Sequence, residues 1–241
     1  MKKNKEKGLG RRMFLKAAAA AAFVMSIPGW VRAFFVDVLY VRTVEQDTFR
    51  FDPATGGIIW KGKKKQEPYL LSVDGMVEHA RTFTYRELLS FPYVTQVSDH
   101  HCVEGWSKAD IRWGGFRFEE IVKRVKPKPE ATHVLFHAIG QTSSKPRGQD
   151  HYIESHPLAK LLDPEQQCLL ALKMDDRHLP HDHGSPLRLV SPFDLGYKSI
   201  KYIERIEFID GPRPGWWTLA NPEYAVDAPV PEKRLRKKKG G

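Results

Sequence analysis

Short apolar runs separated by turn residues dominate the chain between residues 69 and 209. Residues 69–73 (YLLSV) have the length and composition of a strand, and the turn pair Asp74-Gly75 ends it, so we expect a hairpin here. Further runs rich in branched and aliphatic residues have strand length, and turn-forming clusters separate them: 132–138, 168–174, 186–190 and 200–209. These runs predict a sheet assembled from short strands.

Two short amphipathic helices interrupt the predicted strands. Thr84 and Glu87 have the spacing of a capping box, and the helix that they begin must stop near Pro92. Residues 118–125 carry apolar side chains at the i, i+3, i+4 and i+7 positions of a helix. Residues 34–68 show no clear period, so we interpret them as an N-terminal extension that wraps the domain. The chain is therefore mixed α and β.

The composition is that of a globular protein with one main domain. The chain has 241 residues, of which 41% are hydrophobic and 28% charged. Such a chain can bury a full core, which excludes a disordered or collagen-like protein.

The net charge of +10 resides at the two ends of the chain. Residues 1–16 contribute +6 and residues 232–241 contribute +5, so the body between them carries −1. A neutral body argues against a nucleic-acid partner, because phosphate binding needs a cationic face on the folded part. We expect residues 218–241 to form a basic, disordered tail, with contact to anionic lipid or an acidic partner as the alternative.

The first 33 residues resemble a twin-arginine export signal. Arg11 and Arg12 are followed by Met-Phe-Leu-Lys, and the uncharged run 17–31 is too short to span a membrane. The alternative is a buried N-terminal helix, and cleavage after Ala33 stays open. Because this route carries folded proteins, the signal predicts a periplasmic protein whose cofactor is inserted before export.

Two cysteines and four clustered histidines are the candidate metal ligands. Cys168 lies in an apolar run, which is typical of a small core residue, whereas Cys102 lies among polar and aromatic neighbours. A Cys102–Cys168 disulfide remains an alternative in an exported chain. Zinc is the generic hypothesis for the histidines, but their spacing matches no standard zinc site: His100, His101, His181 and His183.

Two long motifs carry a family resemblance. Residues 97–107 (VSDHHCVEGWS) with 113–116 (WGGF), and residues 183–192 (HGSPLRLVSP) with 196–203 (GYKSIKYI), resemble the sulfite oxidase type of molybdopterin-dependent oxidoreductases. The closer match is the bacterial exported branch, which includes periplasmic methionine sulfoxide reductases. The resemblance covers residues 69–217 and implies an α+β domain with a mixed sheet that binds Mo-molybdopterin.

The resemblance also implies roles for individual residues. Cys102 would be the catalytic residue and would donate its thiolate to molybdenum, beside the two dithiolene sulfurs of one pyranopterin. The implied cofactor-binding residues are His183, Arg188, Ser199, Ile200 and Lys201, with His137 in place of a threonine of that branch. Arg188, Lys198 and Lys201 are charges suited to the terminal phosphate. The upstream Asn and Tyr-Glu contacts of the branch have no match in residues 47–52.

The expected reaction is two-electron oxygen-atom transfer. Sulfite is an anion that needs arginines, but residues 100–107 contain none, and residues 142–155 balance Lys145 and Arg147 with Asp150 and Glu154. We therefore expect reduction of a small S-oxide or N-oxide. The alternatives are sulfite oxidation, a zinc-dependent hydrolase and a cofactor-free binding protein.

The chain must receive its electrons from another protein. It contains no Cys-x-x-Cys-His haem motif, so we expect an external electron-transfer protein. The family resemblance implies a membrane haem protein in that role.

Overall fold

The computed structural model describes residues 48–236. The predicted export signal, the first part of the predicted extension and the last five residues lie outside the described residues. No helix among residues 48–236 has the length and apolar character needed to cross a membrane. The predicted domain boundaries at residues 33, 68 and 217 stay predictions.

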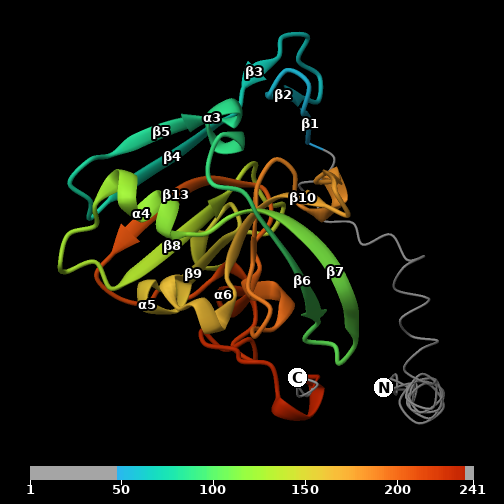
Figure 1. The fold of residues 1–241 in the computed structure, drawn as a ribbon, viewed down its shortest axis with the longest axis vertical. Coiled ribbons are helices and arrows are strands. Elements are labelled where there is room, and N and C mark those ends of the chain that lie inside the picture. The colour runs from blue at the N-terminus through green and yellow to red at the C-terminus, as the bar shows by residue number, and fades with distance from the viewer. Residues whose placement is uncertain (1–47, 237–241) are drawn as a thin grey trace, which may run out of the picture. The chain divides into compact units, whose positions relative to one another are not determined.

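A small antiparallel sheet begins the described chain. Its strands pair in the order β1-β2-β3 (Figure 1). Their bounds are β1 (Phe49–Asp52), β2 (Gly57–Trp60) and β3 (Glu67–Pro68). Strands of four residues or fewer are too short to show an alternating pattern, which is why the sequence showed no period in this segment. The Phe49 ring packs against Tyr202 at 5.5 Å, so the sheet is anchored on the C-terminal half of the domain.

A five-stranded mixed sheet forms the centre of the domain. Its order is β5-β4-β13-β8-β9, and only the β13–β4 pair is parallel. The strands are β4 (Leu70–Gly75), β5 (Arg81–Thr84), β8 (His133–Ala138), β9 (Ile153–Pro157) and β13 (Ile203–Ile209). The predicted mixed sheet is therefore confirmed, and the predicted hairpin is formed by β4 and β5. The prediction that Asp74-Gly75 is its turn is wrong, because both residues belong to β4 and pair with Glu207 and Phe208 of β13.

A second five-stranded sheet carries the first motif. Strands β11, β10, β7 and β6 pair in that order, β12 pairs with β10, and all pairs are antiparallel. The strands are β6 (Val94–His101), β7 (Ser107–Phe116), β10 (Leu169–Met174), β11 (Arg177–His178) and β12 (Arg188–Val190). The β6–β7 hairpin was not predicted, because polar motif residues and the Gly114-Gly115 pair hide its alternation.

The α-helices of the described chain are short: three lie between strands along the chain and the fourth follows the last strand. They are α3 (Tyr85–Leu89), α4 (Glu119–Val125), α5 (Leu158–Leu162) and α6 (Trp216–Ala220). The predicted capping box is confirmed: the Glu87 carboxylate accepts from the Thr84 N–H at 2.7 Å, and the Thr84 hydroxyl accepts from the Glu87 N–H at 3.3 Å. Single 3₁₀ turns occur elsewhere, including His181–His183, Gly196–Lys198 and Glu232–Arg234.

Both large sheets contribute to one hydrophobic core. Val134, Phe136 and Phe208 of the mixed sheet lie in the same buried cluster as Phe116 and Leu170 of the second sheet. Burial of such large side chains contributes about 1.5 to 3 kcal/mol each. The shared core therefore fixes the β6–β7 hairpin relative to β13 and the segment before it.

A buried polar network fastens residues 191–199 to β9. The Lys198 ammonium donates to the Glu154 carboxylate at 2.6 Å and to the carbonyl oxygens of Ser155 and Val226 at 2.8 and 2.6 Å. The His156 Nε2 donates to the Lys198 carbonyl at 2.8 Å. The prediction that Lys198 faces a phosphate is wrong, because its three protons are already used inside the protein.

The C-terminal segment differs from the disordered tail that the sequence led us to expect. The Leu195 N–H donates to the Ala228 carbonyl at 2.9 Å, and the Val230 N–H donates to the Phe193 carbonyl at 2.8 Å. Arg236 pairs with Asp99 and Asp110 of the β6–β7 hairpin. Residues 228–236 therefore lie against the domain, because acidic side chains far away in sequence pair with the basic charges.

Removal of the lysine from the buried Lys198–Glu154 pair should destabilise the protein much more than removal of the lysine from an exposed ion pair. Lys198→Met should lower the free energy of unfolding by about 3 to 5 kcal/mol, since it leaves the Glu154 carboxylate buried without its partner. Lys63→Met is the control, because Lys63 and Glu67 form an exposed pair worth less than about 1 kcal/mol. Urea unfolding of the cofactor-free proteins measures both. Equal losses of unfolding free energy in the two variants would contradict the assignment of Lys198 and Glu154 as a buried ion pair.

Candidate cofactor site

Cys102 begins the turn that joins β6 to β7. Its N–H donates to the Trp106 carbonyl at 2.9 Å, and its own carbonyl accepts from the Gly105 N–H at 3.2 Å. The side chain is half-buried at this end of the hairpin. Burial raises the pKa of the Cys102 thiol, and a hydrogen bond from the Glu104 N–H opposes this effect. A metal ion removes such a proton outright, so the position suits a metal-bound thiolate.

Both cysteines are free in the structure. Cys168 is 2% exposed, and its sulfur lies 3.7 Å from the Ser191 hydroxyl. Burial raises the pKa of the Cys168 thiol to about 11, so it stays protonated and inert. The alternative of a Cys102–Cys168 disulfide is therefore wrong, and the two cysteines lie in the different environments that their sequence contexts indicated.

Arg188 is a buried cation bonded only to uncharged acceptors. The residue is 5% exposed, and its guanidinium donates to the His183 carbonyl at 2.9 Å and to the Ser199 carbonyl at 3.3 Å. No carboxylate among residues 48–236 pairs with it, and burial lowers its pKa to about 10. A guanidinium still keeps its proton at neutral pH. The site therefore holds a positive charge that an anion can balance.

Trp113 of β7 lies under the Arg188 side chain. The guanidinium carbon is 4.8 Å from the centre of the indole ring. The indole Nε1 is buried with no acceptor among residues 48–236. Buried indole N–H groups usually have a partner, so this one is a second polar group left for a ligand.

His100 brings the two sequence motifs together. It lies two residues before Cys102, and a Cβ atom on Gly196 would come within 2.5 Å of its Nε2. Burial and the nearby positive charge of Arg188 lower the pKa of His100 to about 3, with smaller contributions from His101 and Lys201. His100 is therefore neutral and faces the Arg188 region. The sequence marked His100 only as a possible zinc ligand. Its position two residues before Cys102 was the available signal, because side chains two apart in an extended chain point the same way.

The predicted phosphate segment lies beside Arg188. The Ser199 carbonyl accepts from Arg188, and the Ile200 carbonyl accepts from the Leu189 N–H at 3.0 Å. Lys201 is partly buried and donates to the Asp182 carbonyl at 2.9 Å. The Lys201 stem packs against Gly184, which has a φ of +106° and no room for a Cβ. The structure thus brings together five of the predicted residues: His183, Arg188, Ser199, Ile200 and Lys201.

The structure does not bring His137 to this group. The side chain lies 3.1 Å from the Glu207 carboxylate and 3.0 Å from His151, both on neighbouring parts of the mixed sheet. The adjacent Ala138 lies in the hydrophobic core. Because side chains alternate along a strand, His137 points to the face opposite Ala138 and cannot replace a hydroxyl expected there.

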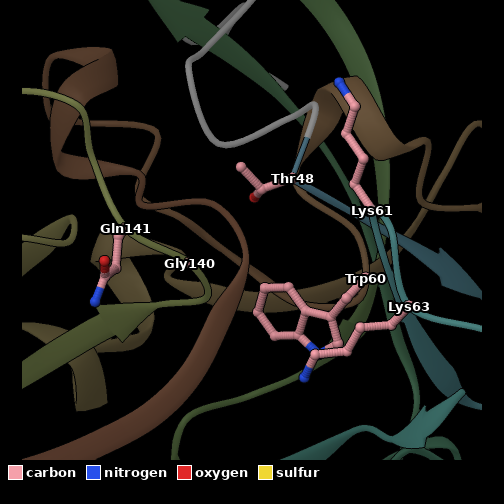
Figure 2. Close-up of a pocket in the computed structure, with 6 residues that line it drawn as sticks. All are labelled: Thr48, Trp60, Lys61, Lys63, Gly140 and Gln141. Carbon is pink, nitrogen blue, oxygen red and sulfur yellow. The ribbon is translucent and has the colours of Figure 1, made fainter. Parts of the chain in front are cut away.

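A cavity of about 620 Å³ opens between the small N-terminal sheet and the segment after β8. Figure 2 shows Trp60 in this cavity, with Lys63 close to its ring and Gly140-Gln141 on the far side. The described lining residues are Thr48, Trp60, Lys61, Lys63, Gly140 and Gln141. Its size is within the range of ligand and cofactor pockets.

The chain neighbours of two lining residues contact the second motif or the residues just before it. Thr48 precedes Phe49, whose ring contacts the His181 ring at 5.1 Å. Gly140 follows Ile139, whose N–H donates to the Tyr202 carbonyl at 2.8 Å. Thr48 and Trp60 come from the predicted N-terminal extension, whose short strands carry no motif that would have marked these lining residues.

These residues fit a molybdopterin cofactor better than a zinc ion. No three His, Cys, Asp or Glu side chains within the described part of the chain converge to hold a metal. A structural zinc site needs four protein ligands and a catalytic one needs three. A molybdenum cofactor brings its own sulfurs and needs one protein thiolate and a cation for its phosphate. Cys102 and Arg188 are side chains of those two kinds, and they would hold the cofactor.

Comparison with known families agrees with this geometry. The family model described as oxidoreductase molybdopterin binding domain matches residues 59–217. The chain belongs to this family. Family membership confirms the predicted Mo-molybdopterin cofactor and the predicted fold.

Two relatives show which branch of the family the chain is similar to. A protein-methionine-sulfoxide reductase catalytic subunit from Ralstonia nicotianae is 30% identical over 220 residues, which cover 84% of this chain and 65% of that protein. The protein of the same name from Gluconobacter oxydans is 36% identical over 172 residues, covering 68% of this chain and 54% of that protein. The chain thus spans between 54% and 65% of the length of these relatives.

A solved structure shows the same fold. The sulfane dehydrogenase SoxCD from Paracoccus pantotrophus superimposes with a TM-score of 0.51 at 17% identity. The superposition covers 78% of this chain and 59% of the other.

The unbalanced charge of Arg188 predicts a loss of cofactor when it is removed. Arg188→Met should lower the molybdenum and pterin content per chain together, by about tenfold, because a charge-assisted hydrogen bond contributes about 1.5 to 3 kcal/mol. Lys201→Met should have a smaller effect, since its ammonium is less buried. Elemental analysis and pterin fluorescence measure the content.

Arg205→Met is the matched control for this prediction. Arg205 has its own carboxylate partners, Asp74 and Glu207, and lies at the surface of the mixed sheet. Its removal should leave cofactor content unchanged. Full occupancy in the Arg188 variant would show that this guanidinium serves the fold alone.

Proposed function

We propose that the protein is an exported Mo-molybdopterin oxidoreductase that reduces S-oxide or N-oxide substrates with electrons from a separate protein. The observation that carries the proposal is the buried Arg188 guanidinium, whose positive charge no carboxylate among residues 48–236 balances. Arg188 belongs to the second motif, which meets the Cys102 hairpin at His100. The names of the relatives support the S-oxide as the substrate class.

Each residue has a role that its surroundings allow. When bound, the cofactor supplies two-electron oxygen-atom transfer. Cys102 provides the thiolate that holds the metal at the end of the hairpin. Arg188 and Lys201 bind the anionic end of the cofactor, and Gly184 leaves room for the Lys201 stem. His100 lies against Gly196 in its neutral form and joins the first motif to the second.

The charge around Cys102 supports a neutral substrate. The structure brings Arg234 and Arg236 near the hairpin, but Arg234 is bonded to backbone carbonyls and Arg236 to two carboxylates. Neither guanidinium is left for a sulfite anion, which would need several such donors. Glu154 does not belong to the predicted substrate-side loop, because it is buried and paired with Lys198. The charged side chains left in that loop are Lys145 and Arg147, which are exposed, and Asp150.

The periplasmic location and the electron partner rest on the sequence. The paired Arg11 and Arg12 with the following Phe-Leu-Lys support export by the twin-arginine route. The missing haem motif supports an external electron donor, for which a membrane haem protein is our proposal.

The proposed direction predicts the outcome of a paired assay. Protein recovered from the periplasmic fraction should reduce methionine sulfoxide or trimethylamine N-oxide with a reduced viologen dye. Its kcat/KM should exceed that for sulfite oxidation by at least about tenfold, a difference of about 1.4 kcal/mol in transition-state stabilisation. Both reactions are measured on one molybdenum-loaded sample.

Two outcomes would contradict the proposal. Efficient sulfite turnover without oxide reduction would reverse the direction. Recovery of the loaded protein from the cytosol alone would contradict export.

A further inference from the structure

The segment 228–236 contacts both halves of the cofactor site. Its first part pairs with residues 193–195, which precede the phosphate segment, through the Leu195 and Val230 N–H groups. Its last part reaches the β6–β7 hairpin, where Arg236 pairs with Asp99 and Asp110. These contacts dock the segment independently of Arg234, which lies between them.

Arg234 binds both ends of the Cys102 turn. Its Nη1 donates to the Cys102 carbonyl at 2.9 Å, and its Nη2 donates to the Trp106 carbonyl and to the Ser107 hydroxyl at 3.1 Å. The Ser107 hydroxyl in turn lies 2.7 Å from the His101 Nδ1. A planar guanidinium holds two acceptors at a fixed separation, which an ammonium cannot do.

The turn itself has few other restraints. The Cys102–Trp106 and Gly105–Cys102 hydrogen bonds close it, and Val103 at its tip is 39% exposed. This five-residue connection, Cys102 to Trp106, has few buried contacts, and such segments open more readily than the strands that they join. Arg234 is the side chain that holds it from outside.

We propose that Arg234 is a positioning residue for Cys102, whose guanidinium clamps the carbonyls of Cys102 and Trp106 and so sets where the thiolate meets the metal. The proposal rests on the proposed function, in which Cys102 is the protein ligand of molybdenum. Arg234 acts through the turn and contacts no substrate.

The test compares three variants of the full chain. Arg234→Met removes the clamp, Arg234→Lys keeps the charge but loses the two-pronged contact, and Lys233→Met removes a neighbouring exposed charge as the control. Hydrogen exchange of the Cys102 and Gly105 amides is measured in the cofactor-free proteins. The Mo(V) electron paramagnetic resonance signal, kcat and KM are measured in the loaded proteins.

The clamp predicts a graded result. In Arg234→Met, exchange of the two amides should rise by about tenfold, since charge-assisted hydrogen bonds are lost. The Mo(V) signal should shift, and kcat should fall while KM stays within about twofold of its original value. Arg234→Lys should lie between this variant and the parent, and Lys233→Met should match the parent.

Other outcomes overturn the proposal. A lower melting temperature with unchanged exchange and an unchanged Mo(V) signal would make Arg234 a structural anchor only. Absence of molybdenum from the parent protein would overturn the metal-positioning role together with the cofactor assignment. If the parent protein holds molybdenum but reduces no oxide, the proposed function fails, whereas the exchange and resonance results still decide the role of Arg234.

Discussion

The buried guanidinium of Arg188 is the interaction on which the site depends. Desolvation of an ion costs several kcal/mol, and here backbone carbonyls offset part of that cost instead of a carboxylate. Those carbonyls belong to His183 and Ser199, so the same contacts fix the loop on either side of β12. The positive charge that remains gives the folded domain an affinity for an anion before any ligand arrives.

The fold brings the hairpin that carries Cys102 to the second motif through His100, which lies against Gly196. One hydrophobic core joins the two large sheets, and the β6–β7 hairpin extends from it to a turn that no core residue supports. His100 packs on Gly196 at the base of that turn. The buried part of the site is thus the Arg188 loop, and the more exposed part is the Cys102 turn, which the C-terminal segment contacts through Arg234.

The sequence predicted the parts of the site that consecutive residues determine. The motifs around Cys102 and Arg188 were found because their residues are close together in the chain, and the capping box at Thr84 is likewise local. Arg234 could not be found this way, because 132 positions separate it from the carbonyl that it binds. Lys198 was assigned to a phosphate because it lies in the second motif. Its true partner is Glu154, which is distant in sequence and which no local pattern reveals.

The central claim is that Cys102 binds the metal of a cofactor whose charge Arg188 balances. X-ray absorption at the molybdenum K-edge tests it most directly, on the loaded parent protein and the loaded Cys102→Ser variant. The account predicts that the parent has one more sulfur neighbour at molybdenum than the variant, while Cys168→Ser leaves the spectrum unchanged. Identical sulfur coordination in the parent and the Cys102 variant would contradict it.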